Sequence, residues 1–232
     1  MGRFRQLFDP PTSAFTYLLA DVETRDAVVI DCVPGQAATV LACLDELDLA
    51  LRYVLATHVH AGERDATAAL RARTGACAAG SAAADARWLQ ARLRHGDTIV
   101  FGGQVLRTLT TPGHTAGCLS YLWQDRVFTG DALLIGGCGC TRLPGGDAGR
   151  LYDSVTRRLF TLPGETLVYP AHDEHGRTVS TIAEEREHNP CFAARSRDEF
   201  VTRMSAAADP AGGRPAPMAQ RPHLPTTSRS PE

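Results

Sequence analysis

Four short clusters of polar residues carry the side-chain types that bind metal ions, and each cluster follows an apolar run of the chain. The clusters are Thr57-His58-Val59-His60, Thr111-Pro112-Gly113-His114, Gly130-Asp131 and Tyr169-Pro170-Ala171-His172-Asp173. Imidazole nitrogens and carboxylate oxygens are ligands for zinc and iron. Any one cluster has an ordinary explanation, such as a turn, a helix cap or a buried histidine. The four together predict a metal site.

The apolar runs before these clusters predict the strands that would position them. Strands are expected over residues 15–19, 27–30, 53–56, 98–100, 104–110, 118–123, 126–128 and 167–169. Helices are expected over residues 36–47, 64–74, 84–93, 148–160, 180–187 and 198–204. Because strand ends of an α/β fold gather at one edge of the sheets, we expect the four clusters to converge there.

Length and composition set the outer limits of the interpretation. The chain has 232 residues, enough for one α/β domain with a sizeable core. We expect that domain over residues 1–204, and a disordered tail rich in Ala, Pro, Arg and Ser over residues 205–232. A net charge of −2 without a basic run argues against nucleic-acid binding. No run of about 18 apolar residues occurs, so no membrane span is expected.

The seven cysteines are irregularly spaced, and the first residues lack the apolar segment of a signal peptide. An odd number of cysteines without an export signal favours reduced thiols in the cytoplasm. Cys138 and Cys140 are separated by one residue rather than two, and no second pair accompanies them. A structural zinc site is therefore not expected.

The order of the clusters is informative as well. Thr57-His58-Val59-His60 comes first, and Pro112-Gly113-His114-Thr115, Thr129-Gly130-Asp131 and Pro170-Ala171-His172 follow. This order and spacing resemble those of the metallo-β-lactamase superfamily. The resemblance implies an α/β fold, the metallo-β-lactamase αββα four-layer sandwich. It also implies a metal site at the strand ends between the two sheets.

Longer segments narrow the resemblance to one family. They are residues 4–9, 15–19, 129–135, 137–139, 151–155, 160–164, 169–173, 178–186 and 189–190. These segments resemble the persulfide dioxygenases, which are close to the glyoxalase II hydrolases. The resemblance implies one Fe(II) per chain, rather than zinc, held by His58, His114 and Asp131. Two histidines and one carboxylate bind one face of an octahedral iron and leave its other positions open.

The reaction implied by this family converts glutathione persulfide, or a related small persulfide, with O2 and water into sulfite and the thiol. Candidate catalytic residues beside the metal are Tyr169, His172 and Cys138. Tyr169 either hydrogen-bonds the substrate or fills the core. Cys138 either lies near the site, where it is open to oxidation, or packs in the interior.

Positions 62 and 63 depart from the superfamily motif His-x-His-x-Asp-His. Gly62 has no side chain to donate, and Glu63 differs from histidine in reach and charge. A second metal ion, which would also use His172 and share Asp131, is therefore not expected. We expect His60 and Glu63 to orient ligands or water rather than to bind the iron.

The loop of residues 137–142 is the second departure from the family. Cys140 stands where the family has an arginine associated with glutathione binding, and Arg142 stands where it has aspartate. In an extended loop the two positions share a side, so Arg142 is a candidate replacement, and Cys140, Arg142 and Tyr169 are candidate substrate contacts. Because cysteine cannot form the fork that arginine offers a carboxylate, we expect weaker glutathione binding or a different persulfide.

Two other functions stay open. A hydroxyacylglutathione (thioester) hydrolase of the glyoxalase II type would need the second metal ion that Gly62 and Glu63 argue against. A non-catalytic metal- or thiol-binding member would explain the departures, although His58, His114 and Asp131 are intact. For the leading function we expect a small-molecule persulfide and O2 as partners, no nucleic acid or membrane, a cytoplasmic location, and a homodimer as the assembly to test.

Overall fold

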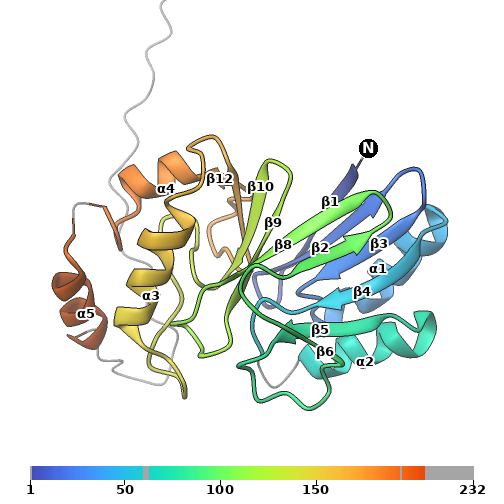
Figure 1. The fold of residues 1–232 in the computed structure, drawn as a ribbon, viewed down its shortest axis with the longest axis horizontal. Coiled ribbons are helices and arrows are strands. Elements are labelled where there is room, and N and C mark those ends of the chain that lie inside the picture. Colours follow the sequence, from blue (N-terminus) through green and yellow to red (C-terminus); the bar gives the residue numbers. More distant parts are fainter. Residues whose placement is uncertain (1, 60–62, 194, 207–232) are drawn as a thin grey trace, which may run out of the picture.

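The computed structural model describes residues 2–59, 63–193 and 195–206, whose strands form two six-stranded mixed sheets (Figure 1). The first sheet has the order β1 (Gly2–Asp9), β2 (Ala14–Asp21), β3 (Asp26–Ile30), β4 (Ala50–Leu55), β5 (Cys77–Ser81), β6 (Ala91–Leu93). The second has the order β12 (Ser180–Thr181), β11 (Leu167–Pro170), β10 (Arg126–Gly130), β9 (Leu119–Trp123), β8 (Gln104–Thr110), β7 (Thr98–Phe101). Strands β3 to β6 are parallel, as are β10 and β11, and the other pairs are antiparallel.

Helices cover the outer face of each sheet (Figure 1). The first sheet is covered by α1 (Ala37–Glu46), which follows the short turn η1 (Pro34–Gln36), and by α2 (Glu63–Thr74). The second is covered by α3 (Ala148–Ser154) with its π-helical continuation η2 (Val155–Leu159), α4 (Ile182–His188) and α5 (Arg197–Ala206). The layers run helix, sheet, sheet, helix, so the predicted four-layer αββα sandwich is confirmed.

Alternation along the strands builds these layers, because successive side chains of a strand point to opposite faces. Tyr17 and Leu19 of β2 face the second sheet and join an apolar cluster between the two sheets. Leu18 and Ala20 point the other way and pack with α1 and α2. The central cluster is rich in buried aromatic side chains, namely Phe15, Tyr17, Phe101, Tyr121, Trp123 and Phe128.

Capping residues set the starts of two helices near the site. The Asp147 carboxylate accepts the Arg150 backbone N–H at 2.9 Å and begins α3. The Thr181 hydroxyl accepts the Glu184 backbone N–H at 3.1 Å and begins α4. Both are residue types that satisfy the free N–H groups of a first helical turn.

The helix predicted over residues 84–93 is wrong. This segment forms turns and then strand β6. Ala86 and Leu89 pack on Ala78 of β5, and the Gln90 backbone N–H donates to the Ala78 carbonyl at 2.8 Å. Docking on the sheet edge therefore overrides the helical preference of an Ala-rich stretch.

Smaller differences lie at other elements. Strands β1 and β5 are present although the sequence did not predict them, and Ser180 and Thr181 pair as β12 before α4 begins. The boundary predicted at residue 204 falls inside α5, which ends at Ala206. The disorder predicted for the tail concerns residues 207–232, which lie outside the described residues. Among the described helices, none is long and apolar enough to cross a membrane.

Candidate metal centre

Strand ends bring the four predicted clusters to one edge of the two sheets. His58 follows the end of β4, His114 follows β8, Asp131 comes directly after β10, and His172 follows β11. The two sheets are joined at this edge, because the Leu119 backbone N–H of β9 donates to the Thr57 carbonyl at 2.6 Å. The clusters therefore sit where a link between the sheets holds the strand ends close together.

His58, His114 and Asp131 are buried, and one potential ligand atom from each lies within 4.8 Å of the others. Oδ2 of Asp131 lies 3.8 Å from Nε2 of His58 and 3.7 Å from Nε2 of His114. These separations exceed a hydrogen bond. Two imidazole nitrogens and one carboxylate oxygen that converge in this way could hold a transition-metal ion between them.

Each of the two histidines has its other ring nitrogen held by an acceptor. The Thr57 hydroxyl donates to Oδ2 of Asp31 at 2.6 Å, so it accepts the hydrogen of His58 Nδ1 at 2.9 Å. His114 Nδ1 donates to the Cys140 carbonyl oxygen at 2.6 Å. Both rings therefore carry a hydrogen on Nδ1 and direct Nε2 toward the carboxylate, so Nε2 is the nitrogen that a metal ion would bind.

Asp31 is a site residue that the sequence analysis missed. It directly follows β3, and its Oδ1 also accepts the Thr57 backbone N–H at 2.7 Å. Burial raises the pKa of Asp31 to about 6, although the two hydrogen bonds from Thr57 work in the opposite direction. The signal available in the sequence was the same as for Asp131, a carboxylate at the end of an apolar strand.

The Asp131 carboxylate is shared between two sides of the site. Its Oδ1 accepts a hydrogen bond from Nδ1 of His172 at 2.7 Å, which leaves Oδ2 directed at the other two histidines. Burial favours the neutral acid, but the His172 hydrogen bond and the charges of His58, His172 and His114 outweigh it. Together they hold the pKa of Asp131 well below its usual range, so the carboxylate is ionised and ready to bind a cation.

Comparison with known proteins places this arrangement in a family. A profile of the metallo-beta-lactamase superfamily matches residues 65–172. The human mitochondrial persulfide dioxygenase ETHE1 is 44% identical over 202 residues, covering 86% of this chain and 79% of the human protein. The chain belongs to the persulfide dioxygenase family. The family predicted from the sequence is thus confirmed.

A solved structure and a more distant relative complete the comparison. The crystal structure of ETHE1 from Myxococcus xanthus is 50% identical, with a TM-score of 0.86, covering 93% of this chain and 94% of that chain. The human hydroxyacylglutathione hydrolase-like protein is 38% identical over 189 residues, covering 76% of this chain and 61% of the human protein. The persulfide dioxygenase family therefore has a neighbour named as a hydrolase at lower identity.

The residues predicted to lie behind the ligands fall largely outside the described part of the chain. His60 and Gly62 lie outside the described residues. Glu63 begins α2, and only its backbone is described. The orienting roles of His60 and Glu63 stay predictions.

Gly139 holds the following loop against the ligands. Its backbone N–H donates to the Asp131 carbonyl at 2.8 Å. A Cβ atom at this position would lie 2.4 Å from that carbonyl oxygen and 2.9 Å from Nδ1 of His114, so only glycine fits. The next residue, Cys140, is half-buried, and its sulfur lies 3.5 Å from the backbone nitrogen of the exposed Arg142. The substrate contacts predicted for Cys140 and Arg142 stay predictions.

The aromatic ring of Tyr169 lies in the core between the sheets. Its centroid is 4.9 Å from that of Phe4 and 5.7 Å from that of Phe128, and the Arg126 guanidinium stands 5.9 Å from it. These contacts support the core-filling alternative for Tyr169, and its role toward substrate stays a prediction. Cys138 packs against the apolar cluster beneath α3 and α5, and its catalytic role likewise stays a prediction.

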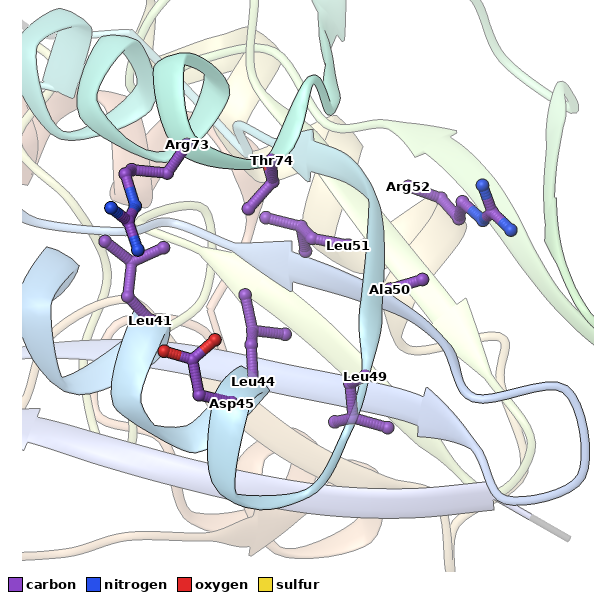
Figure 2. Close-up of a pocket in the computed structure, with 9 residues that line it drawn as sticks. All are labelled: Leu41, Leu44, Asp45, Leu49, Ala50, Leu51, Arg52, Arg73 and Thr74. Atoms are coloured by element: carbon purple, nitrogen blue, oxygen red, sulfur yellow. The ribbon is translucent and has the colours of Figure 1, made fainter.

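A hollow of about 270 Å³ lies at the start of β4 (Figure 2), whereas His58 follows the end of that strand. The start of β4 and the ends of α1 and α2 line it, with apolar Leu41 and Leu44 beside charged Asp45 and Arg73. It shares no residue with the metal centre, and we assign it no role.

Proposed function

We propose that this protein is a persulfide dioxygenase that holds one Fe(II) ion with His58, His114 and Asp131. Its substrate is glutathione persulfide, which reacts with O2 and water to give glutathione and sulfite. The observation that carries the proposal is the buried set of two imidazoles and one carboxylate, whose donor atoms converge. The identity to the human persulfide dioxygenase over most of both chains supports the same activity.

The donor set suits iron chemically. Two nitrogens and one carboxylate oxygen occupy part of the coordination shell and leave room for substrate and O2. Bound Fe(II) supplies electron exchange between the persulfide sulfur and O2, which zinc, having no redox chemistry, does not supply.

The chain's own contribution is to hold each ligand in place before the metal binds. Thr57 and Asp31 orient His58, and the Cys140 carbonyl orients His114. His172 acts as a positioning residue, because its hydrogen bond selects which oxygen of Asp131 faces the metal. Ligands whose second polar atom is already bonded need little reorganisation when the metal arrives.

Thioester hydrolysis is the second candidate, and the identity to the hydroxyacylglutathione hydrolase-like protein is the observation in its favour. That chemistry would use hydroxide held by two metal ions. Gly62 offers no donor to a second ion, and Oδ1 of Asp131 is already bonded to His172. A non-catalytic member of the family is the third candidate, and the intact ligand set argues against it.

The test uses protein purified without oxygen, with metal analysis and with O2 uptake and sulfite formation measured on glutathione persulfide. We expect about one iron per chain, the number that one such ligand set binds. His58→Ala should lose both iron and activity. His95→Ala should keep both, because His95 is exposed and, among the described residues, hydrogen-bonds only to the Thr110 backbone N–H. Two zinc ions with thioester cleavage and no O2 uptake would overturn the proposal, and a His58→Ala variant that keeps iron and activity would refute the ligand assignment.

Location and assembly belong to the same proposal. We place the enzyme in the cytoplasm, on the basis of its seven free cysteines, although the human relative is named as mitochondrial. Cell fractionation tests this location. Size-exclusion chromatography with light scattering tests the homodimer.

A further inference from the structure

Two cysteines meet beside the loop that holds His114. Cys138 and Cys191 are remote in sequence, yet both are half-buried against the apolar cluster beneath α3 and α5. Asn189 ties their backbones together, because its Nδ2 donates to the Gly137 carbonyl at 3.0 Å and its Oδ1 accepts the Cys191 N–H at 2.9 Å. The two thiols lie close enough for each to shift the pKa of the other.

The surroundings of the pair make the two sulfurs chemically different. The hydrogen bond from Cys138 lowers the pKa of Cys191, and the charges of Arg203 and Arg195 lower it further, against the effect of burial. The same hydrogen bond raises the pKa of Cys138 well above its ordinary value, because Cys138 keeps the shared hydrogen. Cys191 is therefore the more readily ionised thiol of the pair and the better nucleophile.

We propose that Cys138 and Cys191 form a modification site, a thiol pair that hydrogen peroxide oxidises reversibly to a disulfide. In the first step the Cys191 sulfur attacks one peroxide oxygen, the O–O bond breaks, and a sulfenic acid and one water form. In the second step the Cys138 sulfur attacks the Cys191 sulfur, the S–S bond forms, the S–O bond breaks, and the second water leaves. Two electrons pass from the two thiols to peroxide, and both thiol hydrogens end in water.

Because the two thiols are paired, oxidation beside the metal centre ends in a disulfide, which is reversible. A sulfenic acid with a neighbouring thiol condenses to a disulfide that reductants restore, whereas a lone sulfenic acid proceeds to sulfinic acid. The crosslink also closes the long segment between residues 138 and 191. Closing a loop of this size should raise the Tm by on the order of 10 °C.

The experiment treats the whole protein with graded hydrogen peroxide, blocks the remaining thiols, and analyses the unreduced peptides by mass spectrometry. We expect a peptide linked through Cys138 and Cys191 that dithiothreitol separates, together with a higher Tm of the oxidised protein. Cys138→Ser, or Cys138→Ala if the serine variant folds poorly, should lose the link and convert Cys191 to sulfinic acid at the same dose. Cys77→Ser is the matched control and should keep the link, because Cys77 is a half-buried thiol in β5 that hydrogen-bonds to the Ala78 carbonyl and belongs to the other sheet's strands.

Three results would each overturn the proposal. The first is oxidation of either thiol to sulfinic acid in the unmodified protein without any linked peptide. The second is a link from Cys138 to Cys140 in place of Cys191. The third is reversible oxidation of Cys191 in the Cys138→Ser variant, equal to that in the unmodified protein. None of these readouts needs iron or persulfide turnover, so failure here is distinct from failure of the proposed function.

Discussion

Replacing Asp31 with asparagine should change which nitrogen of His58 carries the ring hydrogen. In the structure, Oδ1 of Asp31 accepts the Thr57 backbone N–H and Oδ2 accepts the Thr57 hydroxyl. The hydroxyl can then only accept from His58 Nδ1, 2.9 Å away. In Asp31→Asn the amide oxygen must face the backbone N–H, so the amide nitrogen donates to the Thr57 hydroxyl. That hydroxyl then donates to His58 Nδ1, and the ring hydrogen moves to Nε2, where it blocks ligation.

Two magnitudes separate this effect from ordinary destabilisation. Loss of a group that orients a metal ligand weakens metal affinity about 10- to 100-fold, which is about 1.4–2.7 kcal/mol. The folding stability of the metal-free protein should not fall together with the metal affinity. Because the pKa of Asp31 is raised from 3.8 to about 6, the folded state loses stability as pH rises between these values. Asparagine carries no such charge, so Asp31→Asn should be no less stable than the unmodified protein at pH 7.

The assay is competition for the metal between the protein and a coloured chelator, supported by nitrogen–proton NMR of the His58 ring in the metal-free protein. Asp21→Asn is the matched control. Asp21 is also buried and accepts the backbone N–H groups of Glu23 and Gly103, but its hydrogen bonds involve no histidine. Its replacement should leave metal affinity unchanged.

The role of Asp31 in orienting His58 is refuted if Asp31→Asn folds, keeps the ring hydrogen on Nδ1, and binds metal within about twofold of the unmodified protein, well short of the expected loss. Equal losses of metal affinity in Asp31→Asn and Asp21→Asn would refute it as well, because the cause would then be general destabilisation.

Three further predictions concern Gly139, Asp21 and Cys140. Gly139→Ala should abolish tight metal binding, because its Cβ would lie 2.4 Å from the Asp131 carbonyl oxygen. Gly137→Ala is the control and should keep metal binding, because its Cβ would lie 3.8 Å from the nearest atom. Competition with a chelator measures the metal affinity of both variants. The Glu23 backbone N–H and other donors lower the pKa of Asp21 from 3.8 to about 2, so the stability it contributes above 3.8 is lost as pH falls toward 2. In Asp21→Asn the free energy of unfolding, measured by urea titration at each pH, should therefore fall less steeply at acid pH than in the unmodified protein. An equally steep fall would contradict this. Cys140→Arg should lower the KM for glutathione persulfide, and an unchanged KM would count against a glutathione contact at this position.

The parts of the fold and site that could be predicted from sequence are those written in local patterns. Apolar runs ending in His or Asp predicted both the strands and the four clusters that meet at the sheet edge. The contribution of Asp31 could not be seen in this way, because its partner Thr57 is 26 residues away and belongs to another strand end. The pairing of Cys138 with Cys191 likewise depends on how α4 docks on the loop. The false helix over residues 84–93 failed for the related reason that the edge of a sheet decided its conformation.

The number of metal ions that the site can hold depends on what the two carboxylate oxygens of Asp131 bind. In a two-metal site this carboxylate would be shared by both ions, and His172 would turn to the second one. In the structure, Nδ1 of His172 donates to Oδ1 at 2.7 Å, while Oδ2 faces His58 and His114. A second ion would have to displace that hydrogen bond, and Gly62 contributes no ligand to offset its loss. The His172 hydrogen bond thus fixes the orientation of the carboxylate, in agreement with the single ion that we propose.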